Sequence, residues 1–295
     1  MKKSFLLLKL IFSILPSFAQ TKIYLDPQIE KMVTGVSKDS LEPYIQKSAG
    51  FGTRHTLSTQ TDPKNGIGAA RNWVLTRFNE FAEKSNSRLT AIIDTVTLLP
   101  DGHLVDIPLP LGNVVATLNG VDPADHRIFI ICGHLDNRRS NVMDRPGDAP
   151  GANDDASGVA TVMECARIMS KYSSPATIIS VAVSDEEQGL LGANFMAEKA
   201  KQQNWNIEAV SDNDITGGNN SNGTNIISHS KIRGFSEGFS IEDTGRAALN
   251  IRNPGLENDG KPRQLARYVK EIGERYVDNL ESGNDLPKRS FSSWR

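Results

Sequence analysis

The sequence predicts an α/β fold with a twisted, mixed but mostly parallel central sheet that is flanked by helices on both faces. Segments rich in Val, Ile and Thr alternate along the chain with segments whose apolar residues recur at helical spacing. One strand-like segment, TIISVAV at 177–183, is almost entirely apolar, which is typical of a strand buried on both faces of a sheet. Strands that alternate with helices favour one sheet covered on both sides.

Each expected element rests on one of these two patterns. Ile67, Ala70, Val74 and Phe81 fall on one helical face and indicate the first helix, and a similar apolar face follows Ser157. Turn-forming Asp-Gly and Asn-Gly pairs separate the early strands. Strands are expected at 90–99, 113–118, 127–132, 177–183 and 207–212, and helices at 67–81, at 159–166, from Ala193 and at 265–280.

A chain of 295 residues suits one large α/β domain, and no linker divides it. We expect residues 20–295 to form this single domain, with an N-terminal helical layer over about residues 20–85. The Gly- and Asn-rich stretch 217–223 begins a long polar loop that reaches residue 261.

Residues 1–19 have the features of a signal peptide. Lys2 and Lys3 form a positive start, and an apolar stretch over 5–15 follows, interrupted by Lys9. Small residues at 17 and 19 fit cleavage before Gln20. The alternative is an amphipathic helix of the folded domain. The signal peptide predicts an exported protein, periplasmic or extracellular. No Cys follows the cleavage site, so a lipid anchor is not indicated.

Composition excludes some classes of partner. The net charge of −2 provides no basic surface for nucleic acid. No run of 18 apolar residues exists, so no membrane span is expected. The two cysteines, Cys132 and Cys165, lack CxxC spacing and are not expected to bind metal; buried free thiols are favoured over a disulfide.

Candidate metal ligands lie directly after the predicted strands. His134 follows the third strand by two residues, and Glu186 and Glu187 lie just past the fourth. Asp214 follows the last strand, and Asp154 lies in the loop that enters a helix. In open α/β sheets, ligands bind outside the carboxyl ends of the strands. We therefore expect these side chains to meet in one crevice.

The residue types indicate a metal-dependent hydrolase. Imidazole and carboxylates suit zinc or a similar divalent ion, and one aspartate can bridge two ions about 3.5–4 Å apart. Asp136 is placed to accept the second ring N–H of His134. Of the two adjacent glutamates, one can ligate while the other acts as a general base. Each segment alone has a simpler explanation. His134 and Asp136 can be a pair of loop residues, Glu186 and Glu187 can be solvated surface charges, and GANDDASG can be a turn followed by a helix N-cap.

Four segments together resemble the co-catalytic di-zinc aminopeptidase family, which also contains glutamate carboxypeptidase, glutaminyl cyclase and the transferrin receptor ectodomain. They are GHLD, APGANDDASG, DEEQGLLGA and DNDITG. FGTRHT at 51–56 and RGFSEG at 233–238 also resemble segments of secreted bacterial members. The resemblance covers about residues 40–280 and implies a twisted mixed sheet of about eight strands.

The resemblance also implies residue roles. His134, Asp154 and Asp214 would hold one zinc ion, and Asp154 and Glu187 would belong to the site of a second. Glu186 matches the general base, and Asp136 the residue that orients the histidine. The implied function is that of an exported aminopeptidase, which hydrolyses N-terminal peptide bonds of a peptide or peptide-like substrate with two zinc ions as cofactors.

The sequence departs from the family in one respect. The family's second metal site is completed by a histidine far downstream, whereas the histidines here are His55, His103, His126, His134 and His229. His229, in the predicted loop, is a poor substitute. We expect a chain truncated at its C-terminus, without the last strands of the sheet, that leaves the second site with two protein ligands and has weak or no activity.

Two alternatives to an aminopeptidase remain open at the level of the sequence. A glutaminyl cyclase-like acyltransferase would use the same base and a single zinc ion. A non-catalytic member of the same fold would explain the missing histidine, although the presence of His134, Asp154, Asp214 and Glu186 argues against it.

Overall fold

The computed structural model describes residues 25–219, 225, 227–236, 245–252, 258 and 260–283. A mixed five-stranded sheet with the order β1-β2-β4-β3-β5 forms its centre. The three strands β4, β3 and β5 run parallel, and β2 runs antiparallel to both β1 and β4. The strands are β1 (Leu89–Leu98), β2 (Leu109–Leu118), β3 (Ile128–His134), β4 (Thr177–Val183) and β5 (Ile207–Asp212).

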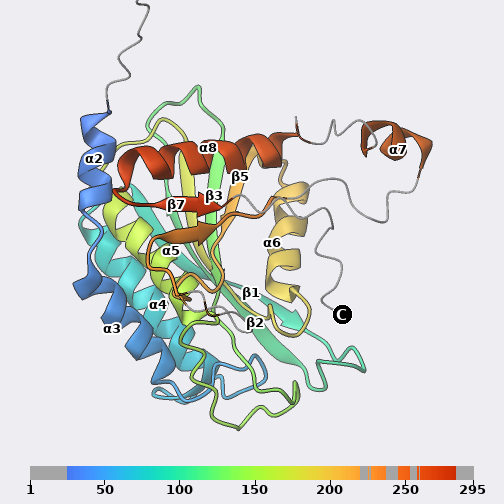
Figure 1. Cartoon of the computed structure of the whole chain (residues 1–295). Coiled ribbons are helices and arrows are strands. Elements are labelled where there is room, and N and C mark those ends of the chain that lie inside the picture. The colour runs from blue at the N-terminus through green and yellow to red at the C-terminus, as the bar shows by residue number, and fades with distance from the viewer. Residues whose placement is uncertain are drawn as a thin grey trace, which may run out of the picture.

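Helices cover both faces of this sheet, which confirms the predicted fold class. Helices α4 (Gly66–Glu83) and α5 (Ala156–Met169) pack on one face, and α3 (Lys38–Ala49) packs against α5 from outside. Helix α6 (Leu191–Gln202) lies on the opposite side (Figure 1). The short α2 (Pro27–Thr34) precedes α3.

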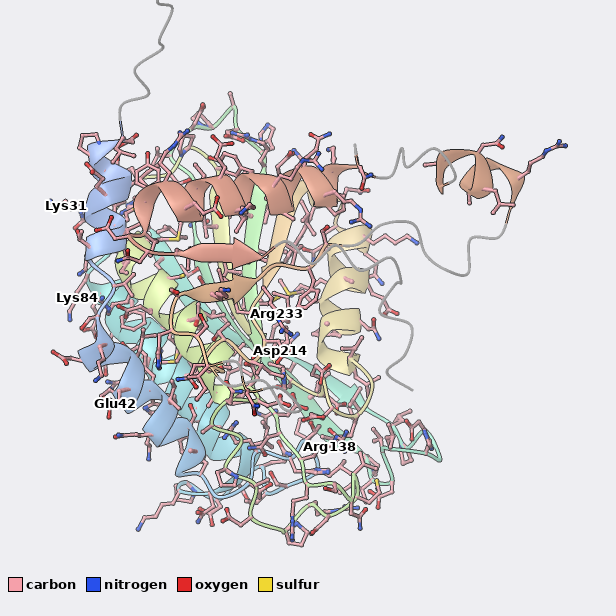
Figure 2. All side chains as sticks on the ribbon, in the orientation of Figure 1. Lys31, Glu42, Lys84, Arg138, Asp214 and Arg233 are labelled. Atoms are coloured by element: carbon pink, nitrogen blue, oxygen red, sulfur yellow. The ribbon has the colours of Figure 1, made fainter. Side chains whose placement is uncertain are left out.

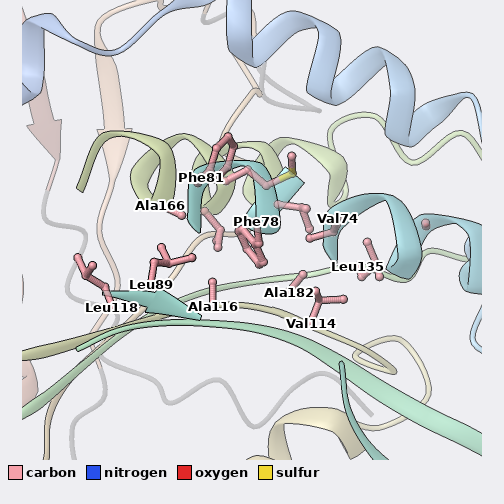
Figure 3. Packing of buried hydrophobic residues seen from close by; sticks show 14 of the residues in the cluster. Val74, Phe78, Phe81, Leu89, Val114, Ala116, Leu118, Leu135, Ala166 and Ala182 are labelled. Carbon is pink, nitrogen blue, oxygen red and sulfur yellow. The ribbon is translucent and has the colours of Figure 1, made fainter. Parts of the chain in front are cut away.

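The core has two layers because side chains alternate along each strand. On one face, Val114 and Ala116 of β2 pack with Val74 and Phe78 of α4 (Figure 3). On the other face, Val115 and its β4 neighbours pack with Met196 of α6. Strand β4 therefore contributes buried residues to both layers, as its apolar sequence predicts.

Some boundaries differ from the expectation. Strand β2 begins at Leu109 because pairing with β1 continues across Pro110 and Gly112, two residue types that hide a strand pattern. Strand β3 continues through His134. Helix α8 (Lys261–Tyr276) begins and ends four residues earlier than expected.

The long region after β5 contains elements that the sequence did not predict. Strand β6 (Lys231–Arg233) pairs in parallel with β7 (Glu281–Gly283), and α7 (Arg246–Arg252) lies apart from the sheet (Figure 1). Three-residue strands are too short to show a period of two. The predicted signal peptide lies outside the described residues.

Two further expectations concern cysteines and membranes. Cys132 and Cys165 are free thiols, as predicted, and both are partly buried. Within the described part of the chain, no helix combines the length and apolar character needed to cross a membrane.

The register of the parallel strands determines where the polar segments lie. His134, the last residue of β3, pairs with Val183, the last residue of β4. Cys132 pairs with Asp212, the last residue of β5. The loops that carry the candidate ligands therefore leave the sheet at nearly the same level and on the same edge.

Phe78 tests the packing of α4 on the sheet. Its side chain is fully buried, so Phe78→Ala should lower the free energy of unfolding by about 3–5 kcal/mol. Urea unfolding followed by circular dichroism measures this. Leu99→Ala, at a position that is 71% exposed, serves as the control. Equal, small effects of the two substitutions would contradict the assigned core.

Candidate metal centre

Three of the predicted ligands converge at the carboxyl ends of β3 and β5. The Nε2 atom of His134 lies 3.1 Å from Oδ1 of Asp154 and 3.8 Å from Oδ1 of Asp214. One ligand atom from each residue lies within 4.8 Å of the others. His134 is buried, whereas both aspartate side chains are about half exposed. One nitrogen and two carboxylates that face solvent on one side form a donor set suited to zinc with an open position.

Asp155 joins the three chain segments that meet here. Its buried carboxylate accepts the backbone N–H of His134 at 3.0 Å, of Gly158 at 2.9 Å and of Ile215 at 3.3 Å. These groups belong to the end of β3, the first turn of α5 and the loop after β5. Asp155 is also the N-cap of α5. The residue next to Asp154 therefore sets the relative position of the three candidate ligands.

Gly158 permits this close approach. A Cβ atom at this position would overlap the carbonyl oxygen of Asn213 and the carboxylate of Asp155. The final glycine of GANDDASG is therefore required by the contact between α5 and the loop that carries Asp214.

Asp136, which we expected to orient the ring of His134, is fully buried and lies beside the Nδ1 atom of that ring. The Nδ1 atom of His134 lies 3.1 Å from the backbone carbonyl oxygen of Asp136, whereas its carboxylate is 3.7 Å away. The two carboxylate oxygens accept the backbone N–H groups of Glu186 and Glu187, both at 3.0 Å. One residue therefore orients the histidine ring through its main chain and fixes the Glu-Glu turn through its side chain.

Glu186 and Glu187 lie on this tethered turn, outside the His134–Asp154–Asp214 group. The carboxylate of Glu187 forms an ion pair with Arg138, with 2.7 Å between Nε and Oε2. Both glutamates are only partly exposed.

Burial and neighbouring charge shift the pKa values at this edge of the sheet. Burial raises the pKa of Glu186 to about 7; the positive His134 opposes this rise and the negative Asp136 adds to it. Burial alone would lower the pKa of His134, but its contacts with Asp136, Asp154 and Asp214 raise it. A carboxyl group with a pKa near neutrality suits proton transfer.

Sequence reasoning missed the buried support of these loops. The side chain of Arg54 is 1% exposed and donates hydrogen bonds to four backbone carbonyls at 2.8–2.9 Å. Burial lowers its pKa to about 10, although the nearby Asp136 and Asp155 raise it. In the sequence, Arg54 could have been found from the segment FGTRHT, and Asp155 from the two adjacent aspartates that precede a helix. The acceptors of Arg54 are Ser48, Leu135, Pro150 and Gly151.

The next residue, His55, joins the same support. Its ring is fully buried, and Nε2 lies 2.8 Å from the carbonyl oxygen of Val142 and 2.9 Å from the amide of Gln188. His229 lies 3.2 Å from the amide of Asn219 and is not part of the ligand group.

This site and fold define a metallohydrolase of the open α/β class. The family model described as peptidase family M28 matches residues 113–265, and the chain belongs to that family.

A curated relative shows how similar this chain is to known family members. It is 38% identical over 259 residues, or 88% of this chain, to a protein of Pyrenophora teres f. teres described as a probable zinc metalloprotease. The chain spans 55% of the length of that relative. Zinc, the metal predicted from the ligand types, agrees with this description.

Solved structures show the same fold. The LapA aminopeptidase of Legionella pneumophila matches with a TM-score of 0.61 at 17% identity, covering 89% of this chain and 57% of LapA. A glutaminyl cyclase of Porphyromonas gingivalis matches with a TM-score of 0.53 at 19% identity, covering 85% of this chain and 77% of the cyclase. At such identities the likeness establishes the architecture and does not separate the two activities.

Asp155→Asn tests the junction of the three segments. The substitution preserves shape but places an NH₂ group where the carboxylate now accepts N–H groups, so a buried donor loses its acceptor. We expect the free energy of unfolding to fall by about 1–3 kcal/mol, measured by urea unfolding. The matched control is Asp62→Asn, because Asp62 caps an exposed turn through Lys64 and Asn65. Unchanged stability of the Asp155 variant would contradict its joining role.

Proposed function

We propose that this chain is the catalytic part of an exported zinc aminopeptidase. The observation that supports this most directly is the convergence of His134, Asp154 and Asp214 at one end of the sheet. The Glu-Glu turn is attached to the same histidine segment through Asp136. A metal-ligand group and a candidate base are thus held by one connected set of hydrogen bonds.

The residues present fit zinc. His134, Asp154 and Asp214 would hold one ion, with Asp154 as the bridging carboxylate and Glu187 as a ligand of a second. When bound, zinc supplies a Lewis acid that polarises the scissile carbonyl and makes water a better nucleophile. The half-exposed aspartates leave the solvent side of the group open to a substrate.

Glu186 acts as the general base in this proposal. Its carboxylate takes one proton from the attacking water as the oxygen bonds to the carbonyl carbon. It then delivers that proton to the leaving amine when the peptide bond breaks. The raised pKa of Glu186, about 7, favours both transfers near neutral pH. Burial next to other carboxylates therefore gives Glu186 a pKa that suits proton transfer.

The test of this function compares two products. Zinc-loaded protein is incubated with a short peptide that has N-terminal Leu and, separately, with one that has N-terminal Gln. Release of free leucine supports the aminopeptidase. Cyclisation of the N-terminal Gln without release of an amino acid would instead favour the hypothesis of a glutaminyl cyclase. Protein that binds no zinc would support a non-catalytic member of the fold.

Glu186→Gln tests the assigned base. The amide cannot accept the proton, so kcat/KM for peptide hydrolysis should fall by a factor of about 10² or more, while the zinc content stays near that of the unsubstituted protein. Metal analysis and initial rates give the two readouts. Glu83→Gln, on an exposed position of α4, is the control. Activity within tenfold of the original would reject Glu186 as the base.

Export gives a separate prediction. Expression of residues 1–295 in a bacterium with a general secretion system should yield exported protein whose N-terminal peptide begins at Gln20, because the small residues before it suit signal peptidase. Mass spectrometry of the exported fraction identifies that peptide. Recovery of a cytoplasmic protein with an intact Lys2–Lys3 start would reject the proposal.

A further inference from the structure

The fully buried ring of His55 forms hydrogen bonds in two directions. Its Nδ1 atom accepts the backbone N–H of Leu57 at 3.0 Å, so the ring hydrogen is on Nε2. Nε2 donates to the backbone carbonyl of Val142 at 2.8 Å. Val142 belongs to the loop after β3, which also carries Arg138 (Figure 2). The ring therefore joins the segment between α3 and α4 to the loop after β3.

The same Nε2 atom also contacts the Glu-Glu turn. The side-chain amide of Gln188, the residue after Glu187, lies 2.9 Å from it. Because Nε2 carries the hydrogen, the amide must meet the ring with its oxygen. That oxygen, Oε1, is buried and has no other hydrogen-bond partner among the described residues. His55 thus holds the turn through a side chain that directly follows the two glutamates.

The position of the Glu186 carboxylate depends on this turn, because the structure holds Glu186 through its main chain. Its backbone N–H donates to the carboxylate of Asp136 at 3.0 Å. Its carbonyl oxygen accepts the N–H groups of Gly189 and Leu190, both at 3.0 Å. A shift of the turn therefore moves the carboxylate with it. Displacement of a reacting group by about 1 Å can lower a rate by a factor of about 10².

We propose that His55 is a positioning residue that holds the Glu-Glu turn through Gln188 and so places the carboxylate of Glu186 for proton transfer. This inference rests on the proposed function, in which Glu186 is the base. It assigns His55 no contact with the reacting atoms. A buried ring that is itself hydrogen-bonded on both nitrogens is a fixed point of this kind, because packing and hydrogen bonds restrict its rotamer.

Two substitutions separate positioning of the turn from support of the segment that contains His55. In His55→Asn, the amide oxygen takes the place of Nδ1 and still accepts from Leu57, but the side chain is too short to reach Gln188. In His55→Gln, the side chain is long enough to reach Gln188 but leaves the N–H of Leu57 without its acceptor. Support of the local segment alone would make the asparagine variant the milder one. Positioning of the turn predicts that the glutamine variant is milder.

Hydrogen exchange of the metal-free protein, followed by mass spectrometry, tests whether His55 holds the turn. In His55→Asn, the peptide that contains Glu186 and Gln188 should exchange at least about fivefold faster, because a buried attachment of the turn is lost. Gln188→Met removes the same contact from the other side and should have the same effect. The double variant should add little to either. Unchanged exchange in both single variants would overturn the proposal.

Initial rates of the zinc-loaded protein on a peptide with N-terminal Leu test the consequence for Glu186. In His55→Asn and in Gln188→Met, kcat should fall by about ten- to a hundredfold, while KM and the zinc affinity stay within about twofold. The ligand group keeps its affinity because Asp155 holds it independently of this turn. His55→Gln should recover most of kcat.

The matched control is His126→Asn, which changes an exposed histidine before β3 and should alter neither exchange nor kcat. A kcat within about twofold of the original in both single variants would overturn the proposal. A loss of zinc affinity as large as the loss of kcat would also overturn it. Absence of peptidase activity in the unsubstituted protein would instead reject the proposed function, and the exchange rates would still decide whether His55 holds the turn.

Discussion

The arrangement of the candidate metal centre depends on the hydrogen bonds of the Asp155 carboxylate. Parallel pairing brings the ends of β3, β4 and β5 to the same level, but strand pairing alone leaves the loops beyond them free to diverge. Asp155 accepts N–H groups from three of those segments, and Gly158 lets them approach. The ligand geometry therefore follows from a buried carboxylate that binds no metal in this account.

The second constraint is the free-energy cost of ionising buried carboxyl groups at one edge of the sheet. Burial raises the pKa of Asp155 to about 8 and that of Asp185 to about 7, because an ionised carboxylate is poorly solvated there. Arg54 supplies a buried positive charge beneath the loops, and the exposed Arg138 supplies a positive charge beside Glu187. A divalent cation among Asp154, Asp214 and His134 would complete this balance, which connects the folding of the loops with metal binding.

Sequence patterns predicted the elements that have a period, and they placed the candidate ligands directly after the strands. Strand β4 and strand β5 have the predicted limits, and His134, Asp154 and Asp214 meet as expected. What escaped prediction depends on contacts between distant segments. The backbone carbonyl of Asp136 has no residue-specific signal, and nothing in the string FGTRHT shows that Arg54 reaches four carbonyls. The pairing of Arg138 with Glu187 likewise joins two loops that are far apart in sequence.

The central claim is that Asp155 and the strand ends build a zinc site from His134, Asp154 and Asp214. The most direct measurement is an anomalous difference map from crystals of zinc-loaded protein, recorded at the zinc absorption edge. The account predicts a peak about 2.0–2.2 Å from Nε2 of His134 and from an oxygen of Asp154 and of Asp214. A strongest peak at any other position, or at a site that lacks His134, would contradict it.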